Sequence, residues 1–212
     1  FKMNGFTMTG GYLVGYRILS VESGIATFEN MEFSNNGGNY NSNLFAGSGI
    51  DQTFFIDCVF KNNNGDNQVG VLWSTAIRCL FYDNHGGNNP SPLYESKAIN
   101  CVVYNTTGGV EENLWTAGAM TNGYAVNCIF WNNTAYYEGG AIYSSQSSQF
   151  VSFLNFDYCT MTGNTAEAGG ASSYGGGISI KINNNLTVSN SILWNNTADD
   201  DPEISFHPTN TI

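Results

Sequence analysis

Two residues of opposite charge, Asp57 and Arg78, occupy the same position in successive copies of a short repeat, directly before a cysteine. If the copies stack as neighbouring strands, the carboxylate and the guanidinium lie side by side. Polysaccharide lyases use Ca²⁺ held by carboxylates with a basic residue, and hydrolases use clustered carboxylates, so this pair is the best catalytic candidate in the chain. A cross-strand ion pair explains it more simply, and we favour a non-enzymatic interpretation.

The two histidines offer less. His85 is expected in a loop and His207 near the end of the sequence. Neither has a serine or cysteine nucleophile at a recognisable spacing, so nucleophilic catalysis is not indicated.

An acidic run near the end of the sequence, Asp199, Asp200 and Asp201 with Glu203, supplies oxygen ligands that Ca²⁺ could use. Residues 62–66 are a second weak candidate for the same ion. Neither segment matches a known calcium-binding loop, so solvated loop charge is the favoured interpretation. Apart from Ca²⁺ as the alternative, we expect no cofactor.

These residues belong to a phrase that recurs along the chain, as Asn-Cys-Ile-Phe-Trp-Asn-Asn at 127–133 and Asp-Cys-Val-Phe-Lys-Asn-Asn at 57–63. The copies begin 21 to 32 residues apart, a period typical of stacked-repeat proteins. The second residues of the eight copies are Phe6, Met31, Cys58, Cys79, Cys101, Cys128, Cys159 and Ser191.

Side chains alternate between the two faces of a strand, so the second residue and the apolar residue two positions later share the inner face. This predicts an inward column of five cysteines. Neighbouring coils are about 4.8 Å apart, but in-register side chains run parallel and do not point at each other. We expect reduced, buried thiols, with at least one disulfide as the alternative. The cysteines are Cys58, Cys79, Cys101, Cys128 and Cys159.

An asparagine follows three positions after the inward aromatic residue in six copies. Asparagine tolerates the left-handed backbone of a tight bend, and its amide both donates and accepts hydrogen bonds. Stacking predicts a hydrogen-bonded ladder at the bend, broken by Gly11 and Thr106. The ladder residues are Asn36, Asn63, Asn84, Asn133, Asn164 and Asn196.

The other face of the repeat strand is apolar and aromatic in the middle copies, where it would form a larger exposed patch than a soluble monomer normally presents. Stacked aromatic rings suit a sugar ring or a protein partner. The simpler interpretation is that a long loop or a neighbouring domain covers the patch. The column proposed as a ligand-binding face is Lys61, Tyr82, Tyr104 and Trp131.

Composition limits the partners. The chain has 17 acidic and six basic residues among 212, a net charge of −11, so nucleic acid and an anionic membrane surface are not expected partners. No apolar run approaches the roughly 20 residues that cross a bilayer, so direct membrane insertion is not expected. The sequence starts at Phe1 without an initiator Met or an export signal, and we interpret it as a piece of a longer protein.

Together these features predict one all-β domain over residues 1–212, a right-handed parallel β-helix of about eight coils. The glycine- and serine-rich segments 37–49, 86–92 and 165–177 are expected to be its irregular loops. A leucine-rich repeat is the structural rival. It fits less well because the chain has only ten leucines and no segment with a convincing helical period.

The phrase Phe-x-x-Asn, as in Phe60 to Asn63 and Phe130 to Asn133, together with Gly-Gly-Ala-Ile at 139–142, resembles the repeats of chlamydial polymorphic outer-membrane proteins. The last copy, at 190–198, looks like the end of the β-helix in anchored bacterial surface proteins. The resemblance implies a pectin-lyase-like β-helix exported to the cell surface, often an adhesin.

The function expected from these observations is that of a non-catalytic, extracellular or cell-surface β-helix domain for adhesion, display or assembly. Its partners would be a surface glycan, a protein, or other domains or copies of the parent protein. A polysaccharide-binding or polysaccharide-degrading β-helix is one alternative. A structural subunit of an extracellular filament or sheath is the other.

Overall fold

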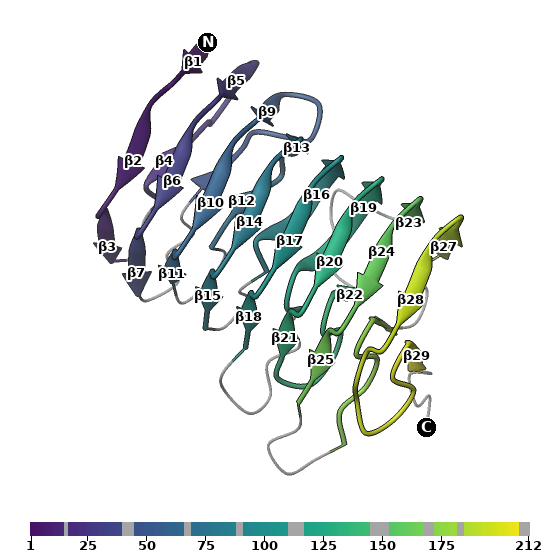
Figure 1. Cartoon of the computed structure of the whole chain (residues 1–212). Helices are drawn as coiled ribbons and strands as arrows, with labels where there is room; N and C mark the ends of the chain where they lie inside the picture. Colours follow the sequence, from purple (N-terminus) through teal and green to yellow (C-terminus); the bar gives the residue numbers. More distant parts are fainter. Residues whose placement is uncertain are drawn as a thin grey trace, which may run out of the picture.

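The computed structural model describes residues 1–14, 17–39, 45–65, 69–87, 91–109, 117–144, 153–167, 172–181 and 185–207. Within them every regular element is a β-strand and every strand pair is parallel. The strands form three sheets of 14, eight and seven strands that run along the solenoid (Figure 1). The parallel β-helix expected from the repeat is confirmed. In the described part of the chain, no helix is long and apolar enough to cross a membrane.

One coil illustrates how the sequence folds. It contains β9 (Thr53–Ile56), β10 (Val59–Lys61) and β11 (Asn64–Gly65), one strand for each sheet. Left-handed bends separate them, at Asp57 with φ 53° and at Asn62 with φ 52°. Asparagine and aspartate tolerate this conformation better than most residues, which explains why the repeat is rich in them.

The eight-stranded sheet carries the central part of each repeat, one strand per coil, and so confirms eight coils. Its strands pair in register, so that Phe60 lies between Phe33 and Phe81. In order, the strands are β2 (Thr7–Thr9), β6 (Glu32–Ser34), β10, β14 (Leu80–Tyr82), β17 (Val102–Tyr104), β20 (Ile129–Trp131), β24 (Thr160–Thr162) and β28 (Ile192–Trp194).

The other two sheets complete the coils. The seven-stranded sheet contains β3 (Tyr12–Val14), β7 (Gly37–Asn39), β11, β15 (His85–Gly86), β18 (Thr107–Gly108), β21 (Thr134–Ala135) and β25 (Thr165–Ala166). The 14-stranded sheet contains β1 (Lys2–Asn4), β4 (Leu19–Ser20), β5 (Ala26–Glu29), β8 (Phe45–Ala46), β9, β12 (Val71–Leu72), β13 (Thr75–Ile77), β16 (Leu93–Ile99), β19 (Met120–Val126), β22 (Ile142–Ser144), β23 (Phe153–Asp157), β26 (Ile178–Lys181), β27 (Asn185–Ser189) and β29 (Ile204–His207).

The segments expected to be irregular loops are partly regular. Short strands occupy the start or middle of all three: β7 and β8 lie within 37–49, β15 reaches into 86–92, and β25 begins 165–177. Residues 40–44, 88–90 and 168–171 lie outside the described residues. The loop assignment of His85 is wrong, because this residue pairs with Asn64 and Thr107 in the seven-stranded sheet.

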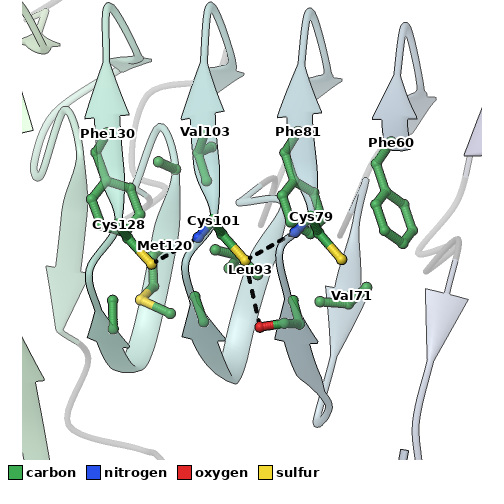
Figure 2. Close-up of a cluster of buried hydrophobic side chains, with 14 of the residues drawn as sticks. Phe60, Val71, Cys79, Phe81, Leu93, Cys101, Val103, Met120, Cys128 and Phe130 are labelled. Atoms are coloured by element: carbon green, nitrogen blue, oxygen red, sulfur yellow. Dashed lines mark hydrogen bonds between the residues drawn. The ribbon is translucent and has the colours of Figure 1, made fainter. Parts of the chain in front are cut away.

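The core consists of columns of side chains that repeat from coil to coil. Phe33, Phe60 and Phe81 stack with ring centroids 4.7 Å apart at each step. Figure 2 shows Phe60, Phe81 and Phe130 in line, with the cysteine column beside them. The phenylalanines Phe33, Phe60, Phe81 and Phe130 are fully buried, and burial of this apolar area is the main stabilising contribution to the fold.

The first coil is less complete. Phe6 occupies the position of the cysteines but is 60% exposed. It pairs with the coil of Met31, and its amide N–H lies 3.4 Å from the Met31 sulfur. Among the described residues it therefore packs against a neighbouring coil on one side only.

Candidate functional site

The outer face of the eight-stranded sheet reaches solvent. Trp131 exposes 50% of its surface and Trp194 exposes 71%, while Tyr82 and Tyr104 are half-buried. Ile129 and Ile192 are also exposed. The outward direction predicted for this column is therefore what the structure shows, and Trp131 is not buried beneath the chain.

The middle of this face is a stack of aromatic rings. The rings of Tyr82 and Tyr104 are 5.2 Å apart and nearly parallel, at 6°. Tyr104 and Trp131 follow at 5.8 Å and 27°. Burial raises the pKa of the Tyr104 hydroxyl, with a smaller contribution from Tyr82. Because each ring covers the face of the next, Tyr104 presents its edge to solvent, whereas sugar stacking needs an open ring face.

Lys61, the first member of the expected ligand-binding face, is paired. Its Nζ lies 3.1 Å from Oε2 of Glu32 in the preceding coil. The hydrogen bond raises the pKa of Lys61 and lowers the pKa of Glu32. The ammonium is therefore held by this carboxylate at the N-terminal end of the aromatic stack.

The aromatic column breaks once towards its C-terminal end. Strand pairing places Thr162 directly between Trp131 and Trp194. The next residue, Gly163, has φ 63°. A β-carbon there would lie 3.7 Å from Cδ1 and 3.8 Å from Nε1 of Trp131, and apart from Gly163 and its two chain neighbours no other described residue comes within 4 Å of that point. The Cδ1–Nε1 edge of the Trp131 indole therefore lies beside the break, and no described atom of the Trp194 coil reaches that point.

Sequence reasoning ended the ligand-binding face at Trp131 and left this break out. The available signal was the phrase Trp-Asn-Asn-Thr-Ala, which occurs at 131–135 and again at 194–198. The intervening copy reads Thr-Gly-Asn-Thr-Ala at 162–166. Two identical phrases flanking a copy that lacks the tryptophan and the first asparagine indicate a gap in the outer surface.

The catalytic candidates Asp57 and Arg78 are brought together as predicted. Arg78 donates from Nε to Oδ1 of Asp57 and from Nη2 to Oδ2, both at 2.7 Å. The guanidinium lowers the pKa of Asp57, and the carboxylate raises the pKa of Arg78. The two hydrogen bonds make this a bidentate ion pair. Because the guanidinium is held in its protonated form, it cannot act as a catalytic base.

The five cysteines are buried and free, and they form the inward column. The amide N–H of Cys79 donates to the Cys101 sulfur at 3.4 Å, as Figure 2 shows. The Cys101 thiol donates in turn to the carbonyl groups of Ile99 at 3.3 Å and Ala76 at 3.4 Å. Burial raises the pKa of the Cys79 thiol well above its ordinary value. All five cysteines belong to the hydrophobic core, where they pack as small side chains.

The asparagine ladder is continuous on either side of Thr106. Oδ1 of Asn63 accepts from the amide N–H and the side chain of Asn36, both at 3.1 Å. Nδ2 of Asn63 donates to the Phe33 carbonyl and to Oδ1 of Asn84, both at 3.0 Å. At the break, the Thr106 amide N–H donates to Asn133. The ladder residues are buried.

The placement of the ladder at the left-handed position of the bend is wrong. That position belongs to the residue just before the ladder position, which is exposed in every copy except at the half-buried Gly163, and each ladder asparagine faces inward because its amide pairs with buried backbone groups. The left-handed residues are Gly10, Asn35, Asn62, Asp83, Asn105, Asn132, Gly163 and Asn195.

The acidic run near the C-terminal end has partners within the protein. Glu203 accepts from Nδ2 of Asn196 at 2.6 Å and so caps the ladder where the next asparagine would stand. Oδ2 of Asp199 accepts from the amide and hydroxyl of Ser173, at 3.0 and 3.1 Å. Oδ2 of Asp201 accepts from Ser205.

Metal-ligating residues do not converge in the described part of the chain, where no group of three His, Cys, Asp or Glu residues could hold an ion. Asp200 contributes its backbone to a bridge with Tyr174. In the second Ca²⁺ candidate, residues 62–65 form the bend and β11, and Asp66 lies outside the described residues. Calcium binding at either segment stays a prediction.

Comparison with models of known protein families, with curated proteins and with solved structures finds no match for this chain. The features that remain for a functional inference are those of its surface. Chief among them is the exposed aromatic face that begins at Tyr82 and extends to Trp194.

Proposed function

We propose that the chain is a non-catalytic domain of an exported bacterial surface protein and that it acts in attachment. The outer face of its eight-stranded sheet is the contact surface. The observation that carries this proposal is the exposure of Ile129, Trp131, Ile192 and Trp194 on one side of a rigid sheet. Aromatic residues dominate binding energy at contact surfaces, and an exposed patch of this kind marks an interaction site.

Rigidity favours such a role. The strands of the face are held by parallel pairing on both sides, from β6 through β24. The stack of Tyr82, Tyr104 and Trp131 holds these rings before any partner arrives. A preorganised surface loses less conformational entropy on binding than a flexible one, so more of the contact energy is available for affinity.

The ion pair of Asp57 and Arg78 supports the non-catalytic part of the proposal, because each group is already the other's hydrogen-bond partner. Export and surface location are supported by the repeats that resemble chlamydial surface proteins, Phe-x-x-Asn and Gly-Gly-Ala-Ile. A net charge of −11 with few lysines suits a soluble, extended surface domain.

The attachment role is tested with the purified chain coupled to beads. Retention of the beads is measured on cultured epithelial cells and on bacterial cell envelopes. The surface variant combines Tyr82→Ser with Ile129→Ser. The matched control is Phe206→Ser, which removes an aromatic side chain that is 62% exposed on β29, outside the eight-stranded sheet. We expect at least a tenfold loss of retention for the surface variant and none for the control.

Equal retention of the two variants, or no retention of the parent chain, would contradict the attachment role. Incubation of the chain with acidic polysaccharides, with and without Ca²⁺, tests the enzymatic alternative. Turnover that Asp57→Ala or Arg78→Ala abolishes would establish that alternative and overturn the non-catalytic assignment.

A further inference from the structure

Two columns on the outside of the β-helix break in the same coil. In the aromatic column Thr162 stands where Trp131 and Trp194 occupy the neighbouring coils. In the adjacent column of left-handed bends, Gly163 stands between Asn132 and Asn195. Thr162 and Gly163 are consecutive residues in the coil of β24, so the two breaks adjoin and form one notch in the surface.

The walls of the notch are exposed. Trp131 is 50% exposed and Trp194 is 71% exposed, and both asparagines are on the surface as well. One face of Trp131 lies against Tyr104, so the stack supports this indole from behind. Its free side faces the coil of Thr162. Trp131 is therefore the ring of the stack that borders the notch.

The width of the notch follows from the strand spacing. Trp131 and Trp194 are separated by two strand spacings of about 4.8 Å, or about 9.6 Å between their backbones. A flat ring in contact with both indoles at about 3.5–4.0 Å per side needs only ~7–8 Å. A puckered, saturated ring is thicker and carries hydrogens on both faces. Two strand spacings therefore leave room for one ring between the two tryptophan positions, and the neighbouring polar groups select its class.

The polar groups beside the indoles fit the same ligand. Nδ2 of Asn132 donates to Oδ1 of Asn105 at 2.9 Å, which fixes the amide and turns its oxygen away from that neighbour. Asn195 supplies a second amide, and Thr162 a hydroxyl at the floor. Amides and hydroxyls pair with sugar hydroxyls. These groups are uncharged, and the chain carries a net charge of −11, so a polyanionic glycan would be repelled.

We propose that this notch, the Trp131–Trp194 slot, binds one pyranose ring of a neutral glycan between the two indoles. The slot lies on the face assigned to attachment, so the inference rests on the proposed function and names its ligand class. The two tryptophans stack on the faces of the sugar ring, and Asn132, Asn195 and Thr162 bond its hydroxyl groups.

Filling the slot tests the proposal. Thr162→Trp continues the aromatic column across the gap, so the variant keeps the fold while its indole occupies the place of the sugar. Trp194→Ala removes one wall. Phe206→Ala is the matched control, an exposed aromatic residue away from the slot. The probes are the hexasaccharides of cellulose, chitin, β-1,3-glucan and β-mannan, with polygalacturonate as the anionic comparison.

Binding is measured by titration calorimetry and by tryptophan fluorescence, and the melting temperature is recorded for each variant. We expect saturable binding of at least one neutral hexasaccharide by the parent chain and by Phe206→Ala. Thr162→Trp and Trp194→Ala should each weaken it at least tenfold without lowering the melting temperature. Polygalacturonate should not compete.

Three outcomes would overturn the proposal that the slot binds a neutral sugar. They are unchanged binding by folded Thr162→Trp, preferential binding of polygalacturonate, and no binding of any neutral hexasaccharide by the parent chain. The bead assay separates this failure from failure of the attachment role. If the double variant Tyr82→Ser with Ile129→Ser loses bead retention while Thr162→Trp keeps it, the attachment role stands and its partner belongs to another chemical class.

Discussion

The inner and outer faces of the β-helix share one backbone but differ in the consequence of a departure from the repeat. On the inner face Thr106 interrupts the asparagine ladder, yet it is buried and its amide N–H still bonds to Asn133. On the outer face Thr162 interrupts the aromatic column, and the exposed Trp131 and Trp194 flank it without a ring between them. Inside the β-helix a substitute hydrogen bond compensates for the irregular residue. Outside, no such bond forms at Thr162, and this position is the one proposed to bind a ligand.

The reason is physical. A buried polar group without a partner costs stability, so an irregular residue inside the solenoid must find a substitute bond. Outside, water satisfies the exposed groups and no such constraint acts. Irregularity inside the coil is therefore expected to affect folding, and irregularity outside is expected to affect binding.

The largest effect should come from the inner aromatic column. Phe60→Ala removes a fully buried ring stacked between Phe33 and Phe81. We expect the free energy of unfolding to fall by about 3–5 kcal/mol, measured by urea denaturation followed by circular dichroism. Tyr82→Ala, in the adjacent coil but on the outer face, is the control and should lose much less. Equal losses would remove the distinction between the faces.

The second largest effect on stability is expected from the asparagine ladder. Asn133→Ala deprives the Thr106 amide N–H and the Val103 carbonyl of their partner. Each buried group left unpaired costs about 1–3 kcal/mol. Conversely, Thr106→Asn extends the ladder between Asn84 and Asn133 and should stabilise the fold by about 1 kcal/mol. Thermal unfolding of both variants checks whether the first is destabilised and the second stabilised. Destabilisation by Thr106→Asn would show that the fold requires the break in the ladder.

The outer stack should matter less for folding than for the position of Trp131. Tyr104→Ala removes both ring contacts of Tyr104 but leaves an exposed site. We expect a loss of about 0.5–1.5 kcal/mol, together with a red shift of tryptophan fluorescence as Trp131 gains water contact. Tyr12→Ala, which alters a 66% exposed ring in the seven-stranded sheet, is the comparison. An unchanged spectrum in Tyr104→Ala would mean that the stack does not hold Trp131.

The smallest effect should come from the exposed ion pair. Arg78 lowers the pKa of Asp57 in the folded state, so the pair stabilises the fold above the ordinary pKa of a free aspartate. That contribution should be lost as the pH falls through the lowered value. Asp57→Asn should therefore change the melting temperature little at pH 7 and flatten its acid dependence. The same acid dependence in Asp57→Asn and the parent would show that the pair contributes nothing.

Much of the fold could be predicted because its signals are local and repeated. The recurrence of Cys, Phe and Asn at fixed offsets, as in Cys58, Phe60 and Asn63, assigned an inner face to every coil. The left-handed bends could not be placed correctly from the same pattern. Two asparagines stand side by side in four of the eight copies, and there burial and backbone conformation distinguish the exposed bend residue, such as Asn62, from the ladder residue Asn63.

The candidate site was predicted in part. The outward column from Lys61 to Trp131 was recognised by alternation, and the pairing of Asp57 with Arg78 by the alignment of copies. The pairing of Lys61 with Glu32 and the role of Glu203 as the ladder cap were missed. The first pair is diagonal, because strand pairing sets Lys61 opposite Ser34 and Glu32 opposite Val59, and Glu203 lies outside the repeated phrase.

The amino-acid pattern alone was enough to specify a stacked parallel β-helix, its period and the residues that face inward, because strand alternation and repeat spacing are properties of the chain itself. Which ring covers which face, and where a gap remains, depends on side chains 22 to 32 residues apart in the sequence that meet only after the coils stack. Trp131, Thr162 and Trp194 belong to three separate copies. Their register in the folded sheet places the two tryptophans on either side of the threonine, where we propose the slot.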